Sequence, residues 1–316
     1  MTAFVVGTRV VVITNALAGQ AVARAEAVTS AVSLWRTHGW DVVVRETTKH
    51  GDAEQYAREA VESGVHLVIP AGGDGTVNEV ANGLVGSTTV LAPLPIGTVN
   101  VWAREAGFSM DVATAAAQIL YAQRSLIDVG VCGDRCFVLM AGIGFDAAVV
   151  QHLYARDKRR FGVMAYIGRI WSVMWGYRGQ KVRVQLDDEV LEVSLLMMIV
   201  SNTARYASFI PFTPDATLDD GMLDVYMLIG ADMLSGPFRF VALYLKRLLP
   251  FLDPHGISRR VRRVTVDGAQ IAMQLDGDHV GTTPADISIR PSALHVLLTE
   301  AAAHTLRLSP WEMERL

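Results

Sequence analysis

The sequence PAGGDGTVNE occupies residues 70–79 and sets the pattern for the first half of this 316-residue chain. It follows an apolar run, His66 to Pro70, and leads into a helix-length segment, Thr76 to Leu84, which predicts a buried strand, a glycine turn and a helix. Glycines in such a turn permit positive φ and let backbone N–H groups approach an anion. The helix N-terminus adds partial positive charge, so phosphate is the expected ligand. Asp74 would repel phosphate unless a cation such as Mg²⁺, or a hydroxyl awaiting phosphorylation, lies beside it.

Around this turn, short β-branched runs alternate with helix-length segments. The strands expected from this pattern are Arg9–Thr14, Asp41–Arg45, His66–Pro70 and Val90–Pro95, and the helices are Ala21–His38, Ala53–Ser63, Thr76–Leu84 and Val112–Ala122. Such alternation predicts a parallel sheet with helical crossovers, a Rossmann-like α/β domain over residues 1–127. Ligands of such sheets bind at the carboxyl ends of the strands. Two further loops, residues 15–19 and 95–100, follow strands at that edge, which weakens the alternative of a plain glycine-rich connection at residues 70–79.

The second half of the chain has a different periodicity. Alternating polar and apolar residues predict strands at Lys181–Leu186, Val190–Val200 and Ile287–Leu298, and a pair of strands within Arg263–Leu275 around Asp267-Gly268. We therefore expect a mainly antiparallel β domain over residues 128–298. Helical stretches are expected near Phe161–Trp175 and Ala231–Leu249, and residues 299–316 are expected to form a helix that docks back on the first domain.

Bulk composition excludes several classes of protein. Apolar residues make up 51% and charged residues 19% of the chain, which is too apolar for a disordered chain, and the net charge of −4 provides no basic field for nucleic acid. No uninterrupted apolar stretch is long enough for a membrane span, and the N-terminus resembles a strand rather than a secretion signal. Cys132 and Cys136 are too few for a zinc site or a disulfide framework, and we expect them to face each other across a Gly133-Asp134 hairpin turn. These features favour a cytoplasmic protein, peripheral at most on the inner face of the membrane.

Motifs of other kinase classes are missing from the chain. No GxxxxGK[ST] sequence occurs, so this is not a P-loop enzyme, and the HRD and DFG elements of protein kinases are not found.

Several segments carry a resemblance to a known family. GGDGTVNEVANGL (Gly72–Leu84) and PIGTVN (Pro95–Asn100) resemble the catalytic domain of the diacylglycerol kinase and sphingosine kinase superfamily, with bacterial diacylglycerol kinase-type lipid kinases as the closest match. The similarity continues through IDVG, AGIGFDA, KRRFGVMAYIGR, PDATLDDGMLDV and LDGD, which occupy residues 127–130, 141–147, 158–169, 214–225 and 275–278. It spans nearly the whole chain in the family's order. The GGDGT core alone is shared with NAD kinases and phosphofructokinases.

The resemblance implies an ATP site on an N-terminal α/β domain, followed by a β-sandwich domain. The positions that match the family's nucleotide contacts are Asn15, Ala16, Leu17, Ala18, Gly19, Thr47, Gly73, Asp74, Gly75, Thr76, Val77, Asn78, Glu79 and Thr98. By the same resemblance, Mg²⁺ would be bound by the Asp220 carboxylate and by backbone carbonyls of Thr217 and Met222, with Asp128 linked to the ion through water. Such oxygen ligands suit a hard cation.

The resemblance also implies a catalytic base in the acidic turn Asp276-Gly277-Asp278. The family's motif ends in Glu, so Asp278 takes that role here as a shorter side chain, with Asp276 as the second choice and Asp74 as a further acid at the site. Without the resemblance, Asp-Gly would simply predict a hairpin turn. The first loop also lacks the family's proline and serine, replaced by Ala16 and Ala18, and Val101 stands where many relatives have Asp. These departures bear on nucleotide and metal affinity more than on the fold.

The expected function is transfer of a phosphoryl group from ATP to the hydroxyl of a diacylglycerol-like lipid. The basic run at residues 156–160, followed by Tyr166, Trp171 and Trp175, suits either contact with an anionic membrane surface or packing on the β domain. Two other functions stay open: a soluble-substrate kinase of the NAD kinase type, whose TPTGSTAY-like segment we do not find, and a non-catalytic nucleotide- or lipid-binding protein. Diacylglycerol, monoacylglycerol, a sphingoid base, ceramide and undecaprenol-like alcohols stay open as the lipid, and a homodimer stays open as the oligomeric state.

Overall fold

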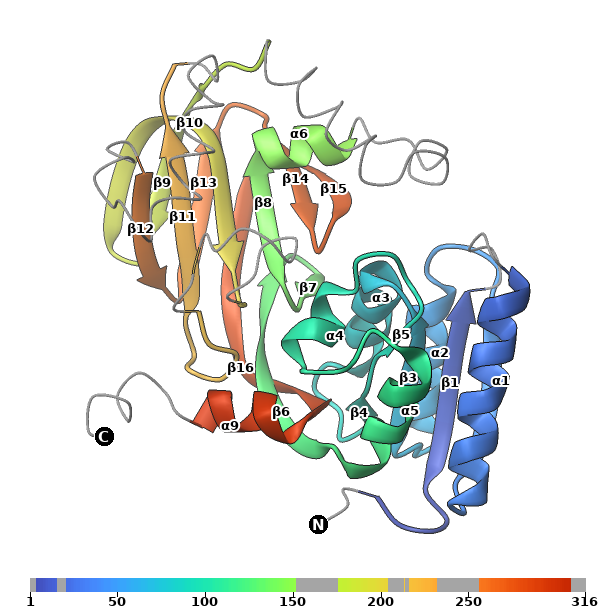
Figure 1. The fold of residues 1–316 in the computed structure, drawn as a ribbon. Coiled ribbons are helices and arrows are strands. Elements are labelled where there is room, and N and C mark those ends of the chain that lie inside the picture. The colour runs from blue at the N-terminus through green and yellow to red at the C-terminus, as the bar shows by residue number, and fades with distance from the viewer. Residues whose placement is uncertain are drawn as a thin grey trace. The chain divides into compact units, whose positions relative to one another are not determined.

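The structure is a computed structural model that describes residues 4–15, 21–151, 176–203, 213, 216–231 and 256–307, with the backbone alone at residues 15, 21–24 and 305–307. It divides into two compact units (Figure 1). The α/β unit comprises Met1–Val129, Thr217–Gly221 and Arg290–Leu316, and the β unit comprises Gly130–Ala216 and Met222–Ile289. Four predicted features lie outside the described residues: residues 16–19 of the first loop, the basic run at 156–160, and most of the two helical stretches near 161–175 and 231–249.

The α/β unit is built on the parallel sheet that the sequence predicts. Its strands lie in the order β4-β3-β1-β2, and β5 pairs with the end of β3. Their bounds are β1 Arg9–Asn15, β2 Asp41–Thr47, β3 Leu67–Gly72, β4 Val90–Leu91 and β5 Leu94–Pro95. Every residue of β3 is buried, as its continuous apolar run predicts for a strand covered on both faces. The fourth predicted strand is split into β4 and β5 because Pro93 between them has no amide to donate to the ladder.

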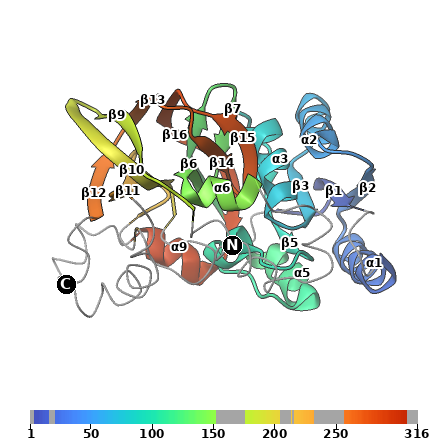
Figure 2. The ribbon, with the colours of Figure 1, turned by 90° about the horizontal axis from the view of Figure 1, so that it is seen from above.

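Helices cover both faces of this sheet. The bounds are α1 Ala21–Thr37, α2 Asp52–Glu62, α3 Asp74–Leu84, α4 Val101–Glu105, α5 Val112–Tyr121 and α9 Glu300–Arg307. Figure 2 shows α1 and α5 on one side of the strands and α2 and α3 on the other. The short helix α4 is not expected from the sequence. The helix α9 belongs to the α/β unit, where the amide of Thr299 donates to the carbonyl of Ala106.

The outermost strand of this sheet, β2, has side chains bonded to two of its backbone carbonyls. The carbonyl of Val42 accepts from Arg36 Nη2 at 2.7 Å, and that of Glu46 accepts from the hydroxyl of Tyr56 at 3.4 Å. Arg36 belongs to α1 and Tyr56 to α2, so both neighbouring helices supply a donor to β2.

The β unit is antiparallel, which confirms the predicted fold class of an α/β domain followed by a mainly antiparallel β domain. Its strands are β7 Arg135–Phe137, β8 Met140–Gly144, β9 Gln180–Leu186, β10 Glu189–Ser201, β11 Leu223–Ile229, β12 Gly256–Val261, β13 Arg263–Gly268, β14 Ala272–Leu275 and β15 Asp278–Thr282. The strands β6 Gln123–Cys132 and β16 Ala285–Leu298 contribute residues to both units. The short helix α6, Phe145–Gln151, follows β8. Side chains such as Phe137, Met198 and Val264 form the core of the β unit.

The predicted pairing of the two cysteines is wrong by one position. The turn Gly133-Asp134 has two residues, so Cys132 pairs with Arg135 and Cys136 pairs with Val131. Both thiols are free.

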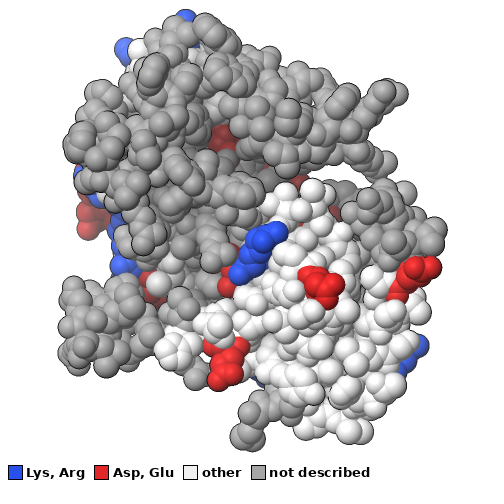
Figure 3. Space-filling model, viewed as in Figure 1, with Lys and Arg blue, Asp and Glu red and all other residues white. Residues whose placement is uncertain are grey.

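Two general properties follow from the described residues. No helix among them is long and apolar enough to cross a membrane. On the face shown in Figure 3, the charged side chains drawn over the α/β unit stand apart from one another and form no continuous basic area.

Candidate functional site

The predicted phosphate loop lies between β3 and α3. The residue before α3, Gly73, is extended, and no side chain caps the helix, so its first backbone N–H groups are left for another acceptor. This is the arrangement expected of an anion-binding helix N-terminus. Gly72 has no room for a side chain, because a Cβ there would lie 2.4 Å from Oγ1 of Thr76.

A second loop, Gly97 to Asn100, lies directly against the first. The amide of Gly97 donates to the carbonyl of Gly72 at 3.2 Å. A Cβ on Gly97 would lie 2.5 Å from the Cα of Gly73, so the two backbones touch with no side chain between them. Asn100 adopts positive φ, 54°, and its amide nitrogen donates to the Gly97 carbonyl at 2.9 Å, while its buried Oδ1 has no hydrogen-bond partner. An unsatisfied buried acceptor beside a glycine loop indicates space for a water or a ligand.

Asp74 holds these two loops together. Its Oδ1 accepts from the backbone amide of Trp102 at 3.0 Å, in the first turn of α4. Burial raises the pKa of Asp74, opposed by the amides of Trp102 and Val101, which favour the ionised form. The structure therefore shows Asp74 in a contact with α4 that the sequence does not suggest.

The other predicted nucleotide residues differ in their surroundings. Thr98 is exposed in the second loop, and Thr47 ends β2 with its hydroxyl 3.4 Å from the carbonyl of Thr14. Val77 and Asn78 are buried in α3 and belong to the interior of the unit. Glu79 accepts from the amides of Gly51 and Ala53, each at 3.1 Å, and so holds the loop after β2 against α3. Asn15 ends β1, and Gly75 lies in the first turn of α3.

The predicted metal residues of the α/β unit also come together. Asp128, at the end of the β6 segment in this unit, accepts from the amide of Gly221 at 2.6 Å and from that of Ser292 at 2.7 Å. Its own amide donates to the carbonyl of Leu218 at 2.7 Å, and the hydroxyl of Thr217 donates to the carboxylate of Asp220. Asp128 thus fixes the turn that carries Asp220. Met222, the next residue after Gly221, is the first of the following segment of the β unit.

Negative charge accumulates at this turn. Desolvation raises the pKa of Asp128, and the charge of Asp220 raises it further, against the effect of its two amide donors. Desolvation also raises the pKa of Asp219, with Asp128 and Asp220 adding to the effect. Within the described ranges, no group of three or more His, Cys, Asp or Glu side chains is arranged to hold a metal ion by itself. A site here would need backbone carbonyls among its ligands, as the resemblance implies.

The two acids of the Asp276-Gly277-Asp278 turn differ in their surroundings. The carboxylate of Asp276 accepts from three consecutive amides, Val138 at 2.8 Å and Leu139 and Met140 at 2.9 Å, and Asp276 has φ of 48°. Asp278 is half-buried, and its side chain makes no hydrogen bond to any described residue. Asp276 is therefore engaged in holding the turn, and Asp278 is the acid left available for a ligand.

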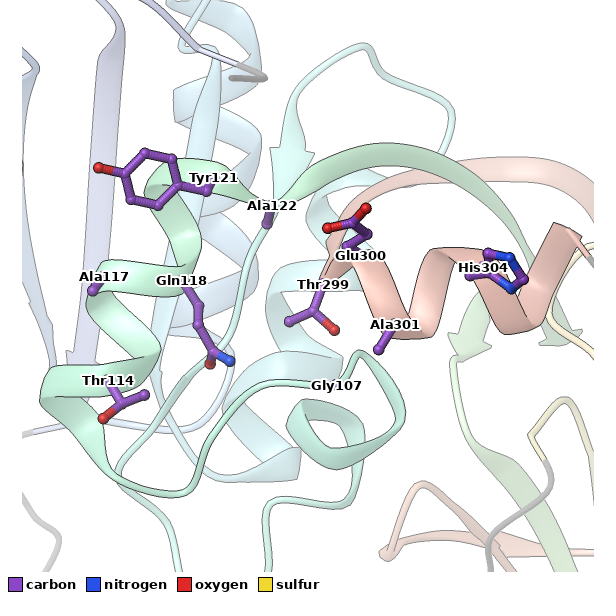
Figure 4. Close-up of a pocket in the computed structure, with 10 residues that line it drawn as sticks. All are labelled: Gly107, Thr114, Ala117, Gln118, Tyr121, Ala122, Thr299, Glu300, Ala301 and His304. Carbon is purple, nitrogen blue, oxygen red and sulfur yellow. The ribbon is translucent and has the colours of Figure 1, made fainter. Parts of the chain in front are cut away.

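A separate open pocket of ≈ 770 Å³ lies in the α/β unit (Figure 4). Its lining comes from α5, from the start of α9 and from Gly107, and none of the residues predicted from the sequence contributes to it. Gly107 is itself pressed against the residue before α9, since a Cβ there would lie 2.1 Å from Oγ1 of Thr299.

Comparisons with known proteins agree with these motifs. Residues 9–132 match the family model described as diacylglycerol kinase catalytic domain, and residues 140–298 match the YegS C-terminal NAD kinase beta sandwich-like domain. The chain is 29% identical to the "Diacylglycerol kinase" of Bacillus subtilis over 85% of this chain and 89% of that protein. It is 30% identical to the "Probable lipid kinase YegS-like" of Pseudomonas aeruginosa over 91% of this chain and 94% of that protein. Among solved structures, a diacylglycerol kinase from Bacillus anthracis has the same fold, with a TM-score of 0.74 at 24% identity over 93% of this chain and 98% of that one.

The contact between the two glycine loops gives a first prediction. Gly97→Ala would force apart backbones that now touch, and we expect it to lower the free energy of unfolding of the α/β unit by about 1–3 kcal/mol. Chemical denaturation followed by circular dichroism measures this. Gly176→Ala is the control, since nothing lies within 4 Å of a Cβ there; equal stability of the two variants would contradict the tight contact.

The Asp276-Gly277-Asp278 turn of the β unit gives a second prediction. Asp276→Ala leaves three amides without their acceptor, and we expect a loss of about 3 kcal/mol or more in unfolding free energy. Asp278→Ala, two residues away, should change the same quantity by less than about 0.5 kcal/mol. The reverse order of these two effects would mean that the roles of the two acids are exchanged.

Proposed function

Since the chain belongs to the diacylglycerol kinase and YegS-like family of lipid kinases, we propose that it transfers the γ-phosphoryl group of ATP, with Mg²⁺, to the hydroxyl of a diacylglycerol-like lipid. The observation that carries the nucleotide half of this proposal is the uncapped N-terminus of α3, closed against a second glycine loop. The choice of a lipid acceptor rests on the family and on the two relatives described above, whose names are "Diacylglycerol kinase" and "Probable lipid kinase YegS-like".

The nucleotide would bind through backbone groups. Backbone amides from Gly73, just before α3, to Thr76 in its first turn would donate hydrogen bonds to the phosphate oxygens, and the glycines let the phosphates approach closely. The free Oδ1 of Asn100 and the exposed hydroxyl of Thr98 offer side-chain contacts in the second loop. Asp74 would act indirectly, by keeping α4 and the second loop in place against the first. Phosphoryl transfer depends mainly on such positioning and on charge stabilisation.

The donor set at Thr217–Gly221 fits Mg²⁺. Desolvation raises the pKa of Asp128 and of Asp219, and neighbouring carboxylates raise both further. A cation would relieve this accumulation of negative charge, and all candidate ligands are oxygen atoms. Asp220 and the carbonyls of Thr217 and Met222 would hold the ion, and Asp128 would hold the turn through its bonds to Gly221 and Ser292. When bound, the ion would neutralise part of the negative charge on the phosphates.

Asp278 would take the proton from the acceptor hydroxyl. Its carboxylate is free of protein partners among the described residues, whereas both oxygens of Asp276 are occupied by amides. A general base must have an oxygen available for the proton that it removes. The acceptor would reach it from a membrane surface, so we place the activity at the inner face of the membrane as a peripheral enzyme.

The proposal predicts the outcome of one assay. Purified protein, ATP and Mg²⁺ should phosphorylate detergent-dispersed diacylglycerol, and Asp278→Asn should lower kcat by about 10²-fold or more because the base is lost. Asp188→Asn, at an exposed turn of the β unit, is the matched control and should keep wild-type turnover. Monoacylglycerol, ceramide, a sphingoid base and NAD serve as further acceptors.

Each alternative result has a defined meaning. Phosphorylation of NAD without any lipid product would identify a soluble-substrate kinase. Tight ATP binding without product on any acceptor would identify a binding protein. Full turnover by a folded Asp278→Asn variant would remove Asp278 from the role of base.

The acidic turn predicts how Mg²⁺ binding depends on pH. The pKa of Asp128 and of Asp219 is raised above the ordinary 3.8, so the folded form binds protons more tightly than the unfolded chain. The stability from these groups is therefore largest below about pH 3.8 and falls as pH rises through the raised pKa values. Millimolar Mg²⁺ should offset this loss at high pH, raising Tm by about 3 °C at pH 8 and by less near pH 5, where protons compete.

Differential scanning fluorimetry measures this effect without any assay of activity. Asp220→Asn should remove the Mg²⁺-dependent rise, and Asp188→Asn should keep it. A wild-type Tm that does not respond to Mg²⁺ at pH 8 would rule out an ion at this turn.

A further inference from the structure

A buried polar pair lies behind the Asp276-Gly277-Asp278 turn of the β unit. Asp146, in the first turn of α6, is 4% exposed, and Gln274, in β14, is 1% exposed. The side-chain amide Nε2 of Gln274 donates to Oδ2 of Asp146 at 2.8 Å. Burying an amide and a carboxyl group is costly unless both are hydrogen-bonded, so the orientation of each side chain is tightly specified.

The other end of Gln274 reaches the acidic turn. Its Oε1 accepts from the backbone amide of Gly277 at 2.6 Å. Gly277 has φ of 88°, so it is at the point where the chain reverses between β14 and β15. A continuous line of contacts thus joins Asp146 to the residue directly before Asp278.

Gly142 leaves space for this pair. It lies opposite Gln274 in the register of β8 with β14. A Cβ at position 142 would be 2.1 Å from Oδ2 of Asp146 and 2.5 Å from Nε2 of Gln274. Within the AGIGFDA segment, Gly142 thus leaves room for the Gln274 side chain and Asp146 accepts a hydrogen bond from it.

The turn is consequently held at two points. Gln274 fixes the amide of Gly277, and Asp276 binds the amides of residues 138–140. Asp278, the first residue of β15, follows directly and has a carboxylate with no protein partner among the described residues. Two separate sets of hydrogen bonds therefore restrain this three-residue turn.

We propose that Asp146 and Gln274 are positioning residues, which set the place of Asp278 for the acceptor hydroxyl by fixing the Gly277 amide. This inference rests on the proposed kinase function. Asp146 acts through the position of its carboxylate oxygen, which accepts from Gln274, and it does not exchange a proton with the substrate. Displacing a reacting group by about 1 Å can cost about 10²-fold in rate, which is the scale on which such restraint matters.

The test compares two variants with a matched control. Gln274→Leu keeps the side-chain volume close but removes both hydrogen bonds, and we expect kcat for lipid phosphorylation to fall by about 10–100-fold. The KM for ATP should stay unchanged, because the residues that the Gln274 side chain bonds, Asp146 and Gly277, are not among the proposed nucleotide residues. Asp146→Asn retains an oxygen that accepts from Gln274 and should keep most of the turnover, with an unaltered pH profile. Gln185→Leu, an exposed glutamine of β9 that bonds only the carbonyl of Asp187, should behave as wild type.

Amide hydrogen exchange at Gly277 provides a readout that does not need activity. It should accelerate in Gln274→Leu and stay slow in Asp146→Asn and Gln185→Leu. Wild-type kcat in Gln274→Leu, or a loss of activity in Asp146→Asn as large as in Gln274→Leu, would overturn the inference. An inactive wild-type protein would instead reject the kinase function, and unchanged exchange at Gly277 in Gln274→Leu would reject the restraint itself. Should Gln274→Leu not fold, Asp146→Ala, which removes the acceptor of Gln274 Nε2, takes its place, with the same expected fall in kcat and the same faster exchange at Gly277.

Discussion

The architecture of the α/β unit depends on the direct contact of two backbones, at Gly73 and at Gly97. No side chain larger than hydrogen fits between them, and the amide of Gly97 is bonded to the carbonyl of Gly72. This contact brings the end of β3 and the end of β5 to one place, so the uncapped amides of α3 and the free Oδ1 of Asn100 share one region. Asp74 adds a bond from this region to α4. The phosphate site that we propose is therefore a property of backbone packing, and charged side chains only secure it.

The acidic residues of the two predicted sites fall into two kinds. Some accept hydrogen bonds from backbone amides and so fix a turn, and others lie on the turn that is fixed. Both carboxylate oxygens of Asp128 accept hydrogen bonds, from the amides of Gly221 and Ser292. Those of Asp276 accept from three successive amides. Each lies near another acid: Asp220, which accepts from the hydroxyl of Thr217, and Asp278, whose side chain makes no hydrogen bond to any described residue. The sequence shows these only as clusters of aspartate, because a hydrogen-bond partner distant in the chain leaves no local signal.

Local patterns predicted most of the fold, and distant contacts account for what they missed. The parallel strands, their helices and the antiparallel strands β9, β10, β13, β14 and β16 follow directly from period and apolar content, whereas β11, β12 and β15 are not among the expected strands. The helix α4 was missed because its capping acceptor, Asp74, lies 28 residues upstream. The register of Cys132 was missed because a two-residue turn shifts the pairing by one position. The sequence singles out Asn100, whose Oδ1 is unsatisfied, only as part of the PIGTVN motif. It gives no local signal for Gln274, because the contacts of this side chain are with Asp146 and Gly277.

The bonds on β2 have a consequence for how copies of this protein meet. A strand at the border of a sheet is an open template on which a foreign strand can grow. Here Arg36 and Tyr56 already occupy two of the carbonyls that such a strand would need. A strand that pairs along Val42–Glu46 would have to displace a guanidinium and a phenol. This border is therefore partly protected against self-assembly, although Val43 and Val44 of β2 are exposed.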